Sequence, residues 1–181
     1  MTLVALHELS REVRERVAVI TLAGAQEHSP EWLQDLDAAR DEVADALAPG
    51  KRALVMLDDG GAPIAWVAAG PAWSRVWELQ PLIVAPEHQR RGHGRRLVRE
   101  IEHLAKAARA LTMMLGTSDT VGATSLSGVD LYYDTFGRLT SLTARRPHAV
   151  EFWRRVGYQV VGVVPDAEGP GKPSISLARR L

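Results

Sequence analysis

Residues 77–110 of the chain read WELQPLIVAPEHQRRGHGRRLVREIEHLAKAARA. The mostly apolar run 79–84 predicts a buried strand, and Pro86 ends it. Beyond a basic loop, apolar residues recur at helical spacing, at Leu97, Ile101 and Leu104. The chemistry is therefore expected at the loop where this strand hands over to a helix.

The loop lacks side chains at Gly92 and Gly94, next to the predicted start of the helix. A helix N-terminus presents unpaired backbone N–H groups and the positive end of the helix dipole, which together favour a bound anion. Positive side chains surround the same point, at Arg90, Arg91, Arg95 and Arg96. A phosphate or diphosphate fits such a loop best, although two glycines before a helix also occur in ordinary tight turns.

The spacing Q-R-R-G-H-G after an apolar strand resembles the acyl-CoA pyrophosphate motif, Q/R-x-x-G-x-G/A, of the GCN5-related N-acetyltransferase (GNAT) superfamily. Further segments follow in consistent order and resemble one branch of it, the aminoglycoside 6'-N-acetyltransferases. They are W-E-L-x-P-L, L-G-T-x-D, V-D-L-Y with T-F, H-x-x-E-F and V-G-Y-x-V-V-G-V-x-P-D-A-x-G-x-G-K-P. The resemblance covers residues 77–181, and residues 1–76 match only in their element pattern.

The resemblance implies acetyl-CoA as cosubstrate, without a metal. Its pyrophosphate would lie on the loop residues Gln89, Arg90, Arg91, Gly92, His93, Gly94 and Arg95, and its pantetheine along Leu82, Ile83 and Val84. Glu78 would be the general base, directly or through water, because the acceptor amine arrives as an ammonium ion. The backbone N–H of Leu82 would stabilise the oxyanion of the attacked thioester.

The substrate implied by the resemblance is the 6'-amine of an aminoglycoside antibiotic, acetylated by direct transfer in a ternary complex, and the implied role is antibiotic resistance. Because an aminoglycoside is a polycation, several carboxylates should face the cleft. The candidate substrate contacts are Trp77, Glu78, Asp119, Asp130 and Asp134. Each aspartate, taken alone, also fits a surface or turn residue.

The sequence departs from this branch at two positions that bear on chemistry. Gln80 replaces the histidine of W-E-L-H-P, and Trp153 replaces the tyrosine of H-P-Y-E-F-Y that is often suggested as general acid. An indole N–H donates a hydrogen bond but gives up no proton near neutral pH, so either another group, such as Tyr158 or water, protonates the leaving thiolate, or this step differs. Two alternatives stay open: acetylation of another small-molecule, polyamine or protein amine, and a non-catalytic acyl-CoA- or drug-binding relative.

Composition narrows the remaining classes. The 181 residues, with 46% hydrophobic content, suit one domain over residues 1–181. Equal numbers of basic and acidic residues, 22 each, argue against a nucleic-acid binder. The chain has no cysteine, and its histidines form no metal-ligand pattern; solvated loop positions are expected for His88 and His93.

Without a secretory segment or membrane span, a cytoplasmic protein with no membrane partner is expected. The resemblance also allows a homodimer.

The remaining periodicity predicts an α+β fold with a mixed sheet, in the order β-α-α-β-β-β-α-β-α-β-β that the GNAT fold also implies. Ser10 is predicted to cap a first helix, and Ser29-Pro30-Glu31 to start a second one that continues from Trp32. Residues 58–61 predict a hairpin turn. The last strand, over residues 174–178, is predicted at an edge of the sheet.

Overall fold

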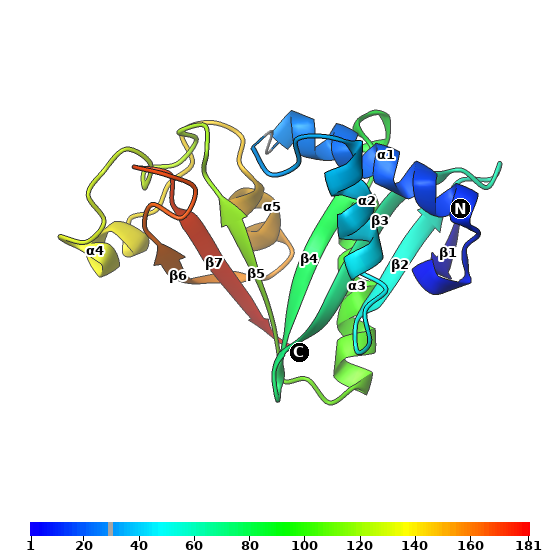
Figure 1. Cartoon of the computed structure of the whole chain (residues 1–181). Coiled ribbons are helices and arrows are strands. Elements are labelled where there is room, and N and C mark those ends of the chain that lie inside the picture. Colours follow the sequence, from blue (N-terminus) through cyan, green and yellow to red (C-terminus); the bar gives the residue numbers. More distant parts are fainter. Residues whose placement is uncertain (29–30) are drawn as a thin grey trace. The chain divides into compact units, whose positions relative to one another are not determined.

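The computed structural model of the protein describes residues 1–28 and 31–181 (Figure 1). The chain divides into two compact units, residues 1–113 with Leu181, and residues 114–180. The α+β class is confirmed by seven strands and five α-helices among the described residues, whereas the single domain over residues 1–181 stays a prediction.

The first unit is built on a four-stranded antiparallel arrangement in the order β1-β2-β3-β4. Its elements, in chain order, are β1 (Thr2–Ala5), the 3-10 helix η1 (Leu6–Glu8), α1 (Arg11–His28), α2 (Leu36–Asp45), β2 (Arg52–Leu57), β3 (Pro63–Trp73), β4 (Val76–Val84), the 3-10 helix η2 (Pro86–His88) and α3 (His93–Ala107). The predicted hairpin at residues 58–61 is confirmed, because Asp58 N–H donates to the carbonyl of Ala62 at 2.9 Å.

Helix α1 is fixed to the sheet through a buried polar contact. The indole Nε1 of Trp66 on β3 donates to Thr21 Oγ1 at 2.8 Å, and this hydroxyl donates to the carbonyl of Val17 at 2.6 Å. Trp66 and Val17 are fully buried in one core cluster with Ile83 of β4. Alternation along β3 turns Ala65 and its neighbours of the same parity to the opposite face, and α3 also packs on β2, β3 and β4. Both faces of this sheet are therefore covered.

Strand β4 carries a bulge that exchanges its two faces. Val67 of β3 pairs with Leu82 and Ala69 pairs with Leu79, so two steps on β3 oppose three on β4. The extra residue lies at Gln80–Pro81, whose peptide bond is cis. Cross-strand partners share a face, and therefore Leu79 and Leu82 lie on the same side.

The second unit contains most of β5 (Thr112–Ser118), then α4 (Thr135–Thr140), α5 (Ala149–Arg155), β6 (Gln159–Val164) and β7 (Ser174–Arg180). Its strands are ordered β5-β7-β6, so the prediction that the last strand is an edge strand was wrong. Strand β7 is internal and buries Ile175 and Leu177 completely. Strand β6 is the edge and leaves Val161 and Val164 more than half exposed.

Of the two predicted starts of the first helices, one was correct and one was wrong. Ser10 Oγ accepts the N–H of Val13 at 3.3 Å, as expected for the cap of α1. The predicted second helix starts too early: residues 31–32 form a turn, and α2 begins only at Leu36, where Asp35 Oδ1 accepts the N–H of Ala38 at 2.9 Å. Two residues of the predicted start, Ser29 and Pro30, lie outside the described residues.

Candidate functional site

The loop that leads into α3 has the backbone of an anion cradle. Gly92, at the N-cap, has a left-handed φ of 86°, and a Cβ added there would meet no atom within 4 Å. The N–H of Arg96 makes the first helical bond, to the carbonyl of Gly92 at 3.1 Å. The N–H groups of His93, Gly94 and Arg95 precede that bond and have no partner inside the helix. They are available to a ligand in front of the helix.

The charged side chains around Gly92 are mostly positive. The four arginines of the loop and first helical turn are exposed, and none is ion-paired within residues 1–28 and 31–181: Arg90, Arg91, Arg95 and Arg96. Gln89 lies deeper. Its Nε2 donates to Glu27 Oε2 of α1 at 2.7 Å and to the carbonyl of Val84 at 3.4 Å. Gln89 thus ties the loop to its supporting helix and strand, while the arginines face outward.

His93 corrects the expectation of a solvated loop histidine. It is only 9% exposed, and its ring lies 6.4 Å from that of His88 between centroids. His93 Nε2 and His88 Nδ1 are both buried without a hydrogen-bond partner in the part of the chain that the structure describes. Burial lowers the pKa of His93, and the nearby His88, Arg91 and Arg96 lower it further.

The β4 residues predicted for catalysis lie on opposite faces. Glu78 is exposed and pairs with Gly70, which places it on the Trp66 side of the sheet. Leu82 and Val84 are half-buried on the other side, and Ile83 is buried in the α1 core. Any contact of a cofactor with Ile83 would therefore use its backbone. Trp77 is buried at 7% exposure and faces away from Glu78 by alternation.

Acids of α2 lie near the face that carries Glu78, and the sequence patterns did not single them out. A Cβ on Gly70 would lie 2.8 Å from Cγ of Lys51, so the Lys51 side chain covers the residue opposite Glu78. Lys51 Nζ in turn is ion-paired with Asp45. Burial, together with the charge of Asp45, raises the pKa of half-buried Glu42 one turn earlier. The missed signal was the acidic spacing of Glu42 and Asp45 on one side of α2.

In the second unit, Asp119 is an internal loop anchor. It is fully buried, and its carboxylate accepts hydrogen bonds from the N–H groups of Ala123 and Thr124 and from Thr124 Oγ1, each at 2.7 Å. Burial alone would raise the pKa of Asp119, but these donors hold it below its ordinary value. With both oxygens committed to the loop, Asp119 does not present a carboxylate to a ligand.

Asp130 and Asp134 are exposed, yet each also organises its own turn. Asp130 Oδ1 accepts the N–H of Tyr132 at 2.9 Å. Asp134 caps α4 by accepting the N–H of Gly137 at 3.1 Å. One oxygen of each carboxylate is thereby used locally, and the exposed side chains leave the other open to solvent.

Helix α5 is anchored by a residue to which the sequence patterns assigned no role. His148 Nδ1 accepts the N–H of Val150 at 3.2 Å, so its Nε2 carries the proton and donates to the carbonyl of Ser118, also at 3.2 Å. Trp153 is buried and makes edge-on ring contacts with Phe152 and Tyr158, at centroid separations of 5.0 and 5.2 Å. Trp153 therefore packs the core of its unit.

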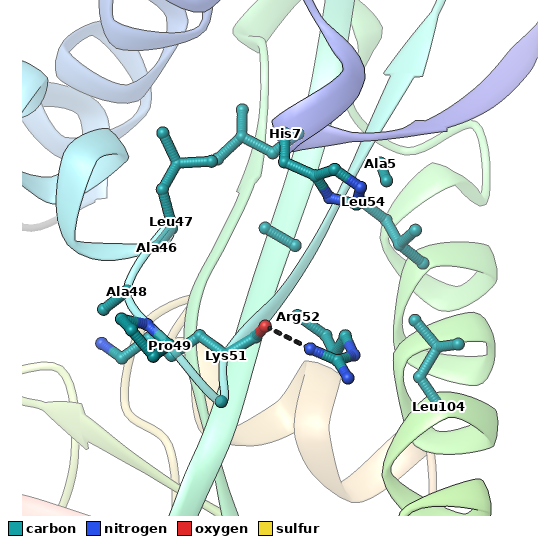
Figure 2. Close-up of a pocket in the computed structure, with 13 residues that line it drawn as sticks. Ala5, His7, Ala46, Leu47, Ala48, Pro49, Lys51, Arg52, Leu54 and Leu104 are labelled. Atoms are coloured by element: carbon teal, nitrogen blue, oxygen red, sulfur yellow. Dashed lines mark hydrogen bonds between the residues drawn. The ribbon is translucent and has the colours of Figure 1, made fainter.

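A pocket of about 250 Å³ lies in the first unit at the far end of α3 (Figure 2). Leu104, His7 and the turn 46–52 line it. Leu104 lies eleven residues after His93, or about 16 Å along the helix at 1.5 Å per residue. The pocket is thus separate from the anion loop, and its walls are mainly apolar.

Two further properties of residues 1–28 and 31–181 bear on the class of site. No cluster of three or more His, Cys, Asp or Glu side chains is arranged to hold a metal ion. No helix there has the length and apolar character needed to cross a membrane.

The chain is similar to a known protein family and to several solved structures. The profile of the Acetyltransferase (GNAT) family matches residues 21–137. No curated protein sequence matched the chain. A crystal structure of an aminoglycoside 6'-N-acetyltransferase complexed with coenzyme A is 29% identical, with a TM-score of 0.89 over 99% of this chain and 97% of that one.

Two further solved structures are similar. The aminoglycoside 6'-N-acetyltransferase from Enterococcus faecium is 28% identical, with a TM-score of 0.87 over 99% of this chain and 97% of that chain. The ribosomal-protein-alanine N-acetyltransferase from Brucella melitensis, at 14% identity and a TM-score of 0.69 over the whole of both chains, shares the fold. From the family profile and the full-length structural matches, the chain belongs to the GNAT family of acetyltransferases.

Proposed function

We propose that this protein transfers the acetyl group of acetyl-CoA directly to a primary amine, and that the 6'-amine of an aminoglycoside is the leading acceptor. The observation that carries the proposal is the loop before α3. There a left-handed Gly92, helix N–H groups without a partner inside the helix, and four arginines without an ion pair among the described residues converge. A diphosphate is the anion that such a loop fits. A solved relative with 29% identity is complexed with coenzyme A.

In this proposal the diphosphate of acetyl-CoA contacts the backbone N–H groups of residues 92–95, and the exposed arginines neutralise its charge. Gln89 acts mainly by holding the loop against Glu27 and Val84. Pantetheine runs along the backbone of residues 82–84. The bulge at Gln80–Pro81 supports this assignment, because it interrupts the ladder of β4 just before Leu82. The N–H of Leu82 would then stabilise the oxyanion.

Glu78 takes the proton of the acceptor ammonium ion, directly or through a water molecule. It is exposed on β4 and so can be reached by a soluble amine. The free amine attacks the thioester carbonyl and the C–N bond forms; the nitrogen then releases its second proton to water, and the C–S bond breaks as CoA thiolate leaves. The thiolate is protonated by water or Tyr158, since Trp153 cannot supply the proton.

The contacts of the polycation follow from where the acids lie. Asp119 is left out of the proposed contacts, because its carboxylate is buried and fully engaged. Asp130 and Asp134 keep exposed carboxylates, and Glu42 and Asp45 of α2 join Glu78 as candidates.

The burial of Asp119 also favours a second candidate function. One carboxylate fewer reduces the attraction for a polycation and suits a smaller or less charged amine, with the same acetyl transfer. Turnover of such an amine, with none of any aminoglycoside, would select this candidate.

The test is release of CoA thiol by purified protein with aminoglycosides that have or lack a free 6'-amine. Turnover restricted to those with the amine is expected. Glu78→Gln should lower kcat by about 10²–10⁴-fold, the usual contribution of a general base, with little change in CoA affinity. Glu12→Gln, at an exposed acid in the first turn of α1, is the matched control and should keep full activity. An unchanged rate in Glu78→Gln would remove Glu78 from the base role.

A further inference from the structure

His88 and His93 form an unexplained feature beside the proposed anion site. A neutral imidazole has one N–H donor and one acceptor nitrogen. Here one nitrogen of each ring, His88 Nδ1 and His93 Nε2, is buried without a hydrogen-bond partner in the described part of the chain. Such groups are rare in folded proteins because a buried polar atom without a partner is costly, and they call for an explanation.

The surroundings of the pair are positive on nearly every side. Burial is the main reason that the pKa of His93 is lowered, and His88, Arg91 and Arg96 add repulsion. Arg90 and Arg95 lie on the same loop and helical turn. The acids near the loop are Glu87, whose Oε1 is 4.0 Å from His88 Nε2, and Glu27, whose Oε2 accepts from Gln89. His93 also follows the N-cap of α3, at the positive end of the helix dipole.

An anion bound in front of α3 would cancel much of this positive potential. The charges of Arg91 and Arg96 and the helix dipole disfavour a proton on His93 in the free protein, and these are the groups that the anion would neutralise. Binding would therefore make the protonated ring more favourable without any movement of the backbone. Protonation would also convert both nitrogens of a ring to donors.

We infer that the His88–His93 pair is a proton acceptor coupled to cofactor binding, so that occupation of the diphosphate site draws a proton from solvent onto the pair. This inference rests on the proposed function, because it requires the anion at the N-terminus of α3. The affinity for the anion then rises as the pH falls, over the window between the titration of the free and of the occupied protein. Binding and proton uptake are linked by the same free energy.

The test is calorimetric titration of dephospho-coenzyme A into the full-length protein, in buffers of different ionisation enthalpy from pH 5 to 8. Dephospho-coenzyme A keeps the diphosphate but lacks the phosphomonoester, which would itself titrate near pH 6. Uptake of about 0.5 proton per bound ligand is expected at its maximum, which corresponds to a roughly threefold gain in affinity per pH unit lowered.

Variants assign the proton to the pair. His93→Asn and the double change with His88→Asn should abolish most of the uptake. His103→Asn is the matched control, because His103 is on α3 with its side chain 66% exposed, and it should take up protons like the unchanged protein. If His93→Asn does not fold, NMR titration of the histidine ring protons of the unchanged protein, with and without ligand, gives the same answer.

The outcomes separate the inference from the function on which it rests. Binding of dephospho-coenzyme A without pH-dependent uptake would overturn the inference and leave the cofactor site intact. Uptake that survives in the double variant would overturn it as well. Failure of both coenzyme A and dephospho-coenzyme A to bind at any pH would remove the proposed cofactor site, and the inference with it.

Discussion

The loop before α3 and the loop after β5 both carry charged residues that attracted functional predictions, but they are built in opposite ways. Around Gly92 the backbone faces outward with unpaired N–H groups, and the arginines are exposed without ion pairs in the described residues. The carboxylate of Asp119 points inward, and both of its oxygens accept hydrogen bonds from Ala123 and Thr124 of the same loop. A charged residue in a loop thus marks a ligand site only when the loop does not itself use that charge.

The largest expected effect is a loss of stability on substitution of Asp119, in the loop after β5. Asp119→Ala would leave the buried N–H groups of Ala123 and Thr124 without acceptors, at a cost of about 2–4 kcal/mol in the free energy of unfolding. Asp130→Ala, at an exposed carboxylate with one local bond, should cost under about 1 kcal/mol. Urea unfolding of the two variants measures the difference.

The same comparison has a pH dependence with a defined sign. Because the pKa of Asp119 is lower in the folded protein than in the unfolded chain, its stabilisation is complete above the unfolded value and is lost as the pH falls through the folded value. The stability gap between the unchanged protein and Asp119→Ala should therefore narrow in acid. A gap that stays constant down to pH 2 would contradict an ionised, hydrogen-bonded Asp119.

A smaller effect separates backbone strain from ligand binding. Gly92 and Gly128 have φ of 86° and 72°, and a Cβ at either would meet no atom within 4 Å. Alanine at each should cost about 1–2 kcal/mol of stability, because the left-handed region is unfavourable for L-residues. Only Gly92→Ala should weaken coenzyme A binding as well, measured by calorimetry. Equal affinity in both variants would argue against the cradle at Gly92.

The smallest effect concerns single arginines. Arg91→Gln should weaken coenzyme A binding by about 3–10-fold at low salt, and less at high salt, because exposed charges are screened. Arg138→Gln on α4 removes the same charge from the second unit and should leave the affinity unchanged. A salt-independent loss in Arg91→Gln would indicate that the arginine shapes the loop and does not attract the anion by its charge.

Much of the fold could be predicted because its signals are local. The periodicity at Leu97 and Ile101, the cap at Ser10 and the hairpin at residues 58–61 each depend on neighbours in sequence, and the structure has them. The position of the last strand could not be predicted, because β7 lies between β5 and β6 through pairing of strands that are far apart in sequence.

The candidate site also has a part that depends on local sequence and a part that depends on distant contacts. The anion loop could be predicted because its motif, Q-R-R-G-H-G, lies in six consecutive residues. The burial of Asp119 and of His93, and the position of Glu42 and Asp45 near the face of Glu78, depend on contacts between separate elements. Only a three-dimensional structure could show which carboxylates are free to meet an amine.

The bulge at Gln80–Pro81 has a consequence for comparing and engineering relatives of this chain. Because side chains alternate along a strand, the extra residue shifts this alternation by one between Glu78 and Leu82, so that the two residues face opposite sides of the sheet. A relative with the same number of residues but no bulge in β4 would have its glutamate and the residue at position 82 on one surface, because they are four residues apart, whereas a relative with one residue fewer keeps the glutamate opposite Gly70. A single gap at this point therefore preserves the side of the sheet on which the glutamate lies, and a gapless alignment with an unbulged relative does not.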